Sequence, residues 1–251
     1  MKEHMASLPL INDFAKRSFR DVADQDYIAA RMSYKAQLRE PFLWSSLQAF
    51  EKYFKAILLF NRKSAKGIGH NINEGLRRVE NIKDISFSIP DDVREFIDYI
   101  NNCGTNRYLE YSTYLRNQAL FSLDKSVWYV RRHCFYMRGE LTNSKGETIE
   151  LLPFNVQKTK NFEEEVSRYK YTIQGGLLEE IISKNKTAAE SLIWHNFYYG
   201  SRQKKIIKNH VNHMSTVNPT LTMHPEIFEE LDSLVDFSKE THKFFKNKAN
   251  N

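Results

Sequence analysis

The sequence has little cysteine and no long run of apolar residues. Cys103 and Cys134 are the only cysteines among 251 residues, and two are too few for a disulfide framework, so a reducing cytoplasm is favoured over secretion. No stretch approaches the ~18 apolar residues that a membrane span requires. The first residues, MKEHMASLPLINDF, contain no cleavage signature. We therefore expect a cytoplasmic protein that does not associate with a membrane.

Several enzyme motifs are also missing. The sequence has no nucleophile elbow, no zinc-protease helix and no dinucleotide fingerprint. The glycines of Gly67-Ile68-Gly69 are far from a phosphate-loop signature. His210 and His213 have a spacing that zinc would tolerate, but no third ligand is evident. We therefore predict neither a metal site nor a cofactor.

What the sequence does have is positive charge and many aromatic rings. The net charge is +6, the isoelectric point is near 9.1, and aromatic residues make up 13%. This balance favours anionic partners, nucleic acid first. The length permits one large domain or two small ones, and either can bury a sizeable core.

The most apolar stretch is Pro41–Arg62, and it predicts the central helix of the fold. Its apolar residues recur mostly at steps of three and four, which places them on one helical face. Further apolar residues widen that face until little of the helix is left for water, as in interior helices. Glu51 and Lys55 are spaced to form an ion pair on the remaining polar strip. The apolar residues are Leu43, Trp44, Leu47, Phe50, Tyr53, Phe54, Ile57, Leu58 and Leu59.

Other helices are expected on both sides of this one. Residues 1–11 read as a loose arm, with Asn12 as the N-cap of a first helix. Asn71 and Glu74 form a capping box, and Thr105–Ala119 reads as irregular. Beyond the central helix, we predict helices over Asn12–Lys35, from Asn71 through Ile82, over Asp91–Asn101 and over Leu123–Tyr136.

The character of the sequence changes after Met137, so we predict one domain over residues 1–140 and a second over 141–251. An Asn-Ser-Lys-Gly turn precedes Glu147–Leu152, which alternates like a strand, and together they predict a short β-hairpin. Thr187 and Glu190 resemble a second capping box. The remaining expectations are a short strand at Tyr171–Ile173, a helix over Gly176–Ser183 and a final helix from Pro225 that buries Leu234 and Val235.

Three short motifs resemble the HEPN family of helical bundles: FEKYFKAILL at Phe50–Leu59, Lys66 with Gly69–Asn71, and Arg107-Tyr108. The resemblance covers residues 12–138. It implies an antiparallel helical bundle, often dimeric, whose members take part in toxin–antitoxin, phage-defence and RNA-processing systems. Catalytic members are metal-independent ribonucleases with an arginine and a histidine a few residues apart. Here Arg116-Asn117 opens that pattern, but Phe121–Leu123 occupy the place of the histidine.

Three groups of residues are candidate sites. The first is a phosphate or nucleotide site, because lysines near a helix N-terminus suit an anion and a tyrosine can stack on a base. The alternative is a helix connector in which His70 is hydrogen-bonded to the bundle. This group comprises Lys63, Lys66, His70, Arg107 and Tyr108.

The second group is Arg131, Arg132 and His133. If the protein cleaves RNA, one of the arginines would hold phosphate and His133 would move protons. The alternative is a solvated face at a helix C-terminus, where the helix dipole favours positive charge.

The third group interleaves aromatic and basic residues, as single-stranded nucleic acid requires. The alternative is that the rings are core and the lysines a solvated face. The group comprises Trp194, Tyr198, Arg202, Lys204, Lys205 and Lys208.

Together these features predict a mainly α-helical, HEPN-like bundle with a helical C-terminal extension and a small β element. The expected function is RNA or nucleotide binding in a bacterial stress, toxin–antitoxin or phage-defence system, with RNA cleavage left open. The expected partners are a second copy of the chain and a cognate antitoxin or other protein. The alternative function is a non-catalytic helical adaptor or dimerisation module.

Overall fold

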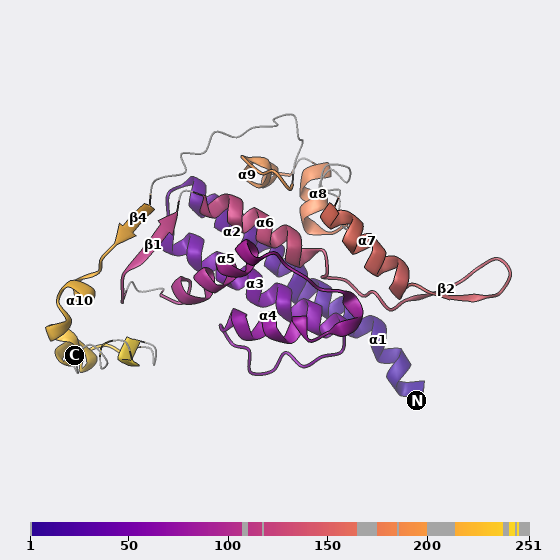
Figure 1. Cartoon of the computed structure of the whole chain (residues 1–251), viewed down its shortest axis with the longest axis horizontal. Coiled ribbons are helices and arrows are strands. Elements are labelled where there is room, and N and C mark those ends of the chain that lie inside the picture. Colours follow the sequence, from indigo (N-terminus) through magenta and orange to yellow (C-terminus); the bar gives the residue numbers. More distant parts are fainter. Residues whose placement is uncertain are drawn as a thin grey trace.

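The computed structural model describes residues 2–106, 110–116, 118–164, 175–184, 186–199, 214–237, 241–243 and 245. The described chain is mainly helical, with two small antiparallel sheets of two strands each (Figure 1). None of its helices combines the length and the apolar character that a membrane-spanning segment requires.

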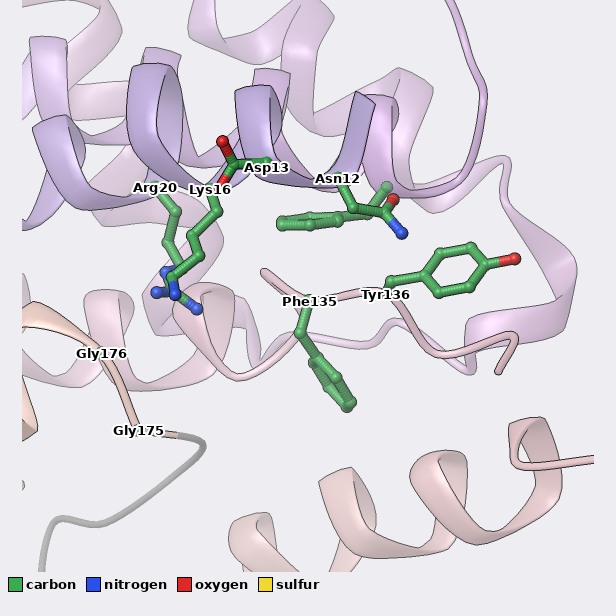
Figure 2. Close-up of a pocket in the computed structure, with 9 residues that line it drawn as sticks. Asn12, Asp13, Lys16, Arg20, Phe135, Tyr136, Gly175 and Gly176 are labelled. Carbon is green, nitrogen blue, oxygen red and sulfur yellow. The ribbon is translucent and has the colours of Figure 1, made fainter. Parts of the chain in front are cut away.

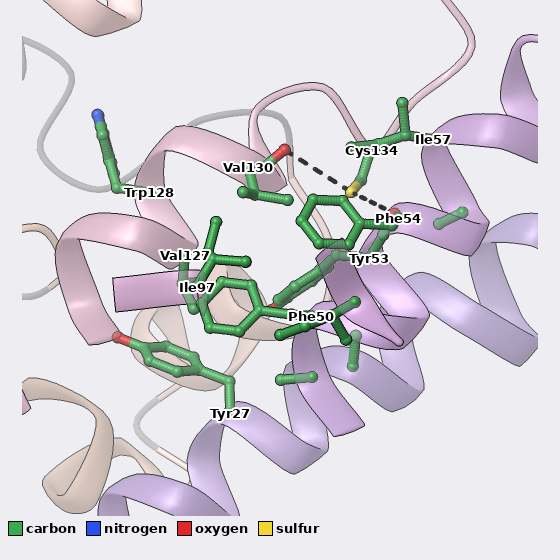
Figure 3. Packing of buried hydrophobic residues seen from close by; sticks show 14 of the residues in the cluster. Tyr27, Phe50, Tyr53, Phe54, Ile57, Ile97, Val127, Trp128, Val130 and Cys134 are labelled. Carbon is green, nitrogen blue, oxygen red and sulfur yellow. Dashed lines mark hydrogen bonds between the residues drawn. The ribbon is translucent and has the colours of Figure 1, made fainter. Parts of the chain in front are cut away.

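The predicted central helix is confirmed as α3, Arg39–Phe60. It contacts α2 (Asp21–Lys35), α4 (Ile72–Glu80), α5 (Asp91–Cys103) and α6 (Ala119–Arg131). Phe50, Phe54 and Ile57 are fully buried, and Figure 3 shows them packed among side chains of the neighbouring helices. The thiol of Cys134 reaches the backbone oxygens of Tyr53 (3.6 Å) and Val130 (3.9 Å) in the same core. The bundle is therefore organised around α3.

The N-terminal segment is helical, so the expected loose arm is wrong. Helix α1 covers Lys2–Phe14, the π-helix η1 covers Ala15–Arg20, and α2 follows without a break. Asn12 lies inside α1 rather than at a helix start. Its side-chain oxygen accepts from Arg62 Nη2 at 2.8 Å, so a tertiary contact has replaced the predicted cap.

The N-cap half of the capping box at Asn71 is confirmed, because its side chain accepts from the backbone N–H of Glu74. The reciprocal half is not formed, since the N–H of Asn71 donates to the Ile68 carbonyl and the Glu74 carboxylate accepts from Arg77 and Arg78. The second capping box is wrong: the N-cap of α9 (Ala189–Ile193) is Ala188, and no side chain caps that helix. The expectation of irregular structure before α6 is also wrong in part. Strand β1, Thr113–Arg116, pairs there with β4, Met214–Val217, from nearly a hundred residues further along.

The predicted β-hairpin is confirmed as β2 (Glu140–Thr142) and β3 (Thr148–Glu150), with Leu141 opposite Ile149. Helix α7 follows at Leu152–Glu164, and the helix expected after Gly176 is α8, Leu177–Ser183. The expected strand at Tyr171–Ile173 lies outside the described residues.

The final helix is shorter than predicted and broken into pieces. From Pro225 it consists of a 3-10 turn (Pro225–Ile227) and α11 (Phe228–Asp232), and a further short helix, α10 (Thr220–Met223), precedes the predicted start. Leu234 and Val235 are 73% and 53% exposed, so the expected apolar face does not extend to them.

The division of the chain at residue 140 stays a prediction. Leu178, Ile181 and Leu192 from α8 and α9 belong to the same buried cluster as the bundle, and both helices contact α2. A separate small cluster contains Leu221, Phe228 and Phe245. Part of the predicted extension thus completes the core of the bundle.

Candidate functional site

A cavity of ≈ 550 Å³ lies between the N-terminal helix, the segment after α6 and the start of α8 (Figure 2). Its volume falls within the ~300–1,000 Å³ typical of small-molecule sites. It is lined by Asn12, Asp13, Lys16, Arg20, Phe60, Phe135, Tyr136, Gly175 and Gly176. We call it the π-helix pocket, because η1 supplies its basic residues.

The π-helix presents Lys16 and Arg20 to this pocket. The backbone N–H of Asp21 bonds the carbonyl of Lys16, five residues earlier, which is the wide-turn pattern of a π-helix. Such turns are rare and occur often at functional sites. In Figure 2 both basic side chains extend toward the segment that carries Gly176.

Positive charge remains available at the pocket. Arg20 is only 6% exposed, and its Nε and Nη2 both donate to Asp21 Oδ1, at 3.0 and 2.9 Å. Among the described lining residues Asp13 is the one carboxylate, and it accepts from Arg17 Nε at 2.9 Å. Lys16 is exposed and forms no ion pair within the described part of the chain. The unpaired ammonium of Lys16, beside a guanidinium that Asp21 already holds, therefore supplies most of the attraction for an anionic ligand.

The other side of the pocket is aromatic. Phe60 ends α3, and Phe135 and Tyr136 follow α6. The guanidinium of Arg62 lies over the Tyr136 ring, 5.1 Å from its centre, which is a cation–π distance. A flat ligand can therefore meet aromatic rings close to the cations of η1.

Gly175 and Gly176 close the pocket rim with φ angles of 72° and 133°, which side chains rarely adopt. A Cβ atom on Gly176 would lie 2.8 Å from Arg20 Nη2 and 3.2 Å from Arg131 Nη2. Only glycine lets the chain approach these two guanidinium groups so closely.

Arg131, from the predicted catalytic group, lies behind this rim in a buried ion-pair network. Its Nε and Nη2 donate to the two carboxylate oxygens of Asp24 at 2.7 and 2.8 Å, and its Nη1 and Nη2 donate to those of Glu179 at 2.6 and 2.8 Å. Burial raises the pKa of Asp24, although Arg131 and Tyr53 act to lower it. Burial is the largest single effect on Glu179 and acts to raise its pKa, but the charge and hydrogen bonds of Arg131, with smaller contributions from a backbone hydrogen bond and from Arg20, together hold the pKa below its ordinary value.

Arg132 and His133 are buried as well. Arg132 Nε donates to His133 Nε2 at 3.2 Å, which places the imidazole proton on Nδ1. That atom has no hydrogen-bond partner among the described residues, and the ring packs on Phe87 at 4.8 Å. Burial and the charge of Arg132 lower the pKa of His133 well below its ordinary value.

This burial shows that the cluster is not the solvated helix end of the alternative interpretation. Arg131, Arg132 and His133 are 2%, 1% and 1% exposed, whereas RNA contact and a solvated helix end each require exposure to water. Their assignment as catalytic residues stays a prediction, and it requires that the network open.

His70 attaches the loop between α3 and α4, which carries the predicted phosphate or nucleotide site, to α3. Its Nδ1 lies 2.8 Å from Glu51 Oε2, and Glu51 also bonds Lys55 as predicted. The expected hydrogen bond of His70 to the bundle is confirmed, while the phosphate or nucleotide site at this loop stays a prediction. Lys63 and Lys66 are exposed on the same loop, while Arg107 and Tyr108 lie outside the described residues.

The third predicted group is described only in part. The Trp194 ring stacks on His195, with centres 4.4 Å apart, and the Trp194 carbonyl accepts from Arg31. Tyr198 packs between Phe121 and Trp128, each 5.9 Å away. Both rings are partly buried, so the structure leaves the two alternatives open. Four basic members of the group, Arg202, Lys204, Lys205 and Lys208, lie outside the described residues, as do His210 and His213.

Sequence reasoning missed the π-helix pocket. Lys16 and Arg20 are an ordinary basic pair in a helical pattern. The neighbouring residues do not indicate a π-helix, and they do not indicate that Gly175 and Gly176 lie close by. Within the described residues no three His, Cys, Asp or Glu side chains gather as metal ligands would. No family model matches the chain, and no curated protein or solved structure is significantly similar to it.

Proposed function

We propose that this protein binds RNA or nucleotides, and that the π-helix pocket is where the ligand binds. The single observation that carries the proposal is the joint placement of Lys16 and Arg20 opposite Phe135 and Tyr136 around one cavity. Cations hold phosphate and rings stack bases, so the two features together match the two parts of a nucleotide.

In the proposed complex a phosphate lies against Lys16 and Arg20, under the close approach of Gly176. Arg20 is already held by Asp21, so its guanidinium is pre-ordered and loses little freedom when the ligand binds. The base lies toward Tyr136, on the ring face that Arg62 does not cover. The resemblance to HEPN bundles supports the same ligand class and a bacterial stress, toxin–antitoxin or phage-defence setting.

The proposal is limited to binding because the geometry favours no cleavage step. Arg131 is held by two carboxylates, and His133 has a lowered pKa and no exposed nitrogen. A general base must come within about 3 Å of the proton that it removes. A ribonuclease activity would therefore need a different arrangement of these side chains.

Binding to fluorescently labelled single-stranded RNA at several salt concentrations tests the proposal. Lys16→Gln should weaken binding about tenfold or more and reduce the slope of log affinity against log salt by about 0.7. Lys145→Gln is the matched control, because it removes the same charge from an exposed lysine that does not line the pocket. Equal loss in both variants, or wild-type binding in both, would contradict the proposal.

A second candidate function, the dimerisation or adaptor module, is favoured by the hairpin β2–β3, which projects from the bundle (Figure 1). Leu141 and Ile149 are cross-strand partners, so they share one face, and they are 58% and 38% exposed. Sedimentation of the wild type and of a Leu141→Ser variant tests it. Dimerisation that is insensitive to salt and lost in the variant would support this function.

A further inference from the structure

The π-helix pocket has cationic groups at both of its ends. Arg17, Arg20 and Arg138 each contact a carboxylate, that of Asp13, Asp21 or Asp84. Lys16 and Arg62 form no such pair within the described residues. Lys16 lines the end near Gly176, whereas Arg62 lies behind Asn12 and Tyr136, which line the other end. Figure 2 shows these two ends apart, with Phe135 between them.

Arg62 is held in place, but its charge is not neutralised. Its Nη1 donates to the carbonyl of Leu59 at 2.7 Å, and its Nη2 donates to the carbonyl of Leu8 and to Asn12 Oδ1. All of these acceptors are neutral. Its left-handed backbone, with φ 56°, belongs to the Schellman motif that ends α3, in which the N–H groups of Lys63 and Arg62 donate to the carbonyls of Leu58 and Leu59 at 2.8 and 3.0 Å.

Asn12 connects Arg62 to the pocket. Its amide lines the cavity, and its oxygen accepts from Arg62 Nη2 at 2.8 Å. An anionic oxygen that replaced this amide oxygen would form a charge-assisted hydrogen bond, which is about twice as strong as a neutral one. The Asn12 end is therefore a second place in the pocket where an anion would be stabilised by a charge-assisted hydrogen bond.

We infer that the pocket takes a nucleotide with phosphate groups on both its 5′ and 3′ sides, as each internal residue of an RNA strand has, rather than a mononucleotide. One phosphate lies at Lys16 and Arg20, the base stacks on Tyr136, and the second phosphate lies at Asn12 and Arg62. This inference rests on the proposed function, and it names the class of ligand that the same pocket accepts.

The test compares two probes, adenosine 5′-monophosphate and adenosine 3′,5′-bisphosphate, by isothermal titration calorimetry. The wild type should bind the bisphosphate at least about tenfold more tightly, because the second phosphate adds a charge-assisted contact. Arg62→Gln should lose that advantage while its affinity for the monophosphate changes little. Lys16→Gln should weaken the binding of both probes.

Two further variants keep the test decisive. Arg62→Lys retains the charge and should keep part of the preference for the bisphosphate. Lys145→Gln, which removes an exposed charge outside the lining, should bind both probes as the wild type does. Unchanged monophosphate binding in Arg62→Gln would also show that this variant is folded.

The outcomes separate the two proposals. If both probes bind with equal affinity to the wild type, or if Arg62→Gln weakens both equally, the two-phosphate inference is wrong and the nucleotide pocket stands. If neither probe binds and single-stranded RNA does not bind either, the proposed function fails and the inference fails with it.

Discussion

Asp24 and Arg131 form a two-pronged ion pair at the centre of the protein, with both side chains at most 1% exposed. Asp24 also accepts from Tyr53 on α3, and Arg131 reaches Glu179 on α8. A reciprocal pair, Arg31 with Asp124, joins the same two helices in the opposite sense. The network therefore connects α2, α3, α6 and α8, and it lies directly behind the pocket.

Replacing Arg131 by Met should lower the free energy of unfolding by roughly 3–5 kcal/mol, because it leaves two buried carboxylates without their cation. Urea unfolding followed by circular dichroism measures the change. The variant Arg17→Met removes an exposed pair, whose side chains are 75% and 52% exposed, and should cost less than about 1 kcal/mol. Similar losses in the two variants would contradict the assigned network.

The stability of the protein should fall in mild acid because of His133. Its folded pKa lies well below the ordinary value, so only the unfolded chain takes up a proton near pH 6.5. The contribution of His133 to the free energy of unfolding is fully present above about pH 6.5. It is lost progressively as the pH falls from there toward the folded pKa. The loss should therefore grow as the pH is lowered from 7 to 5.

Unfolding at the two pH values, for the wild type and for His133→Asn, isolates this contribution. The variant cannot titrate at this position, so its stability should change less between pH 7 and pH 5. An identical pH dependence in both proteins would show that His133 is protonated to the same extent when folded and unfolded.

Gly176→Ala should disturb both the pocket and the network, because its Cβ would lie 2.8 Å from Arg20 Nη2. We expect weaker nucleotide binding together with a lower melting temperature. Gly175→Ala is a partial control, since Gly175 has a positive φ of 72° and no described atom lies within 4 Å of the place that its Cβ would occupy, although its backbone is less restricted to glycine than that of Gly176 at φ 133°. If the two variants lose binding equally, backbone strain rather than the close approach explains the glycine.

The helices were predictable where local spacing decides the structure. The apolar spacing of Pro41–Arg62 predicted α3, because the residues that bury this helix on most of its sides all lie in one continuous stretch. The pair Asn71 and Glu74 predicted the start of α4, because an N-cap hydrogen bond joins residues only three apart. Local sequence failed for Thr113–Arg116, whose strand exists only through its pairing with β4.

The candidate site was not predictable, because its partners are distant in sequence. Arg131 reads as a solvated basic residue until Asp24, 107 positions away, is placed beside it. The pocket joins α1 and η1 to Gly175–Gly176 across more than half of the chain. No periodicity or short motif in the sequence indicates that these segments lie beside one another.

Tyr136 should carry the stacking part of ligand binding. Tyr136→Ala should weaken nucleotide binding by ~1–3 kcal/mol, the usual effect of losing one base stack. Tyr136→Phe keeps the ring and should bind nearly as the wild type does. Calorimetric titration of both variants checks the expectation, and equal weakening by the two changes would assign the effect to the hydroxyl instead.

Photo-crosslinking tests the central claim most directly. Single-stranded RNA that contains 4-thiouridine is irradiated with the wild-type protein, and the attached peptide is mapped by mass spectrometry. The account predicts attachment at Phe135 or Tyr136, and its loss when Lys16→Gln is used. Attachment at the Lys63–Asn71 loop or around Trp194 instead, with Phe135 and Tyr136 unmodified, would contradict it.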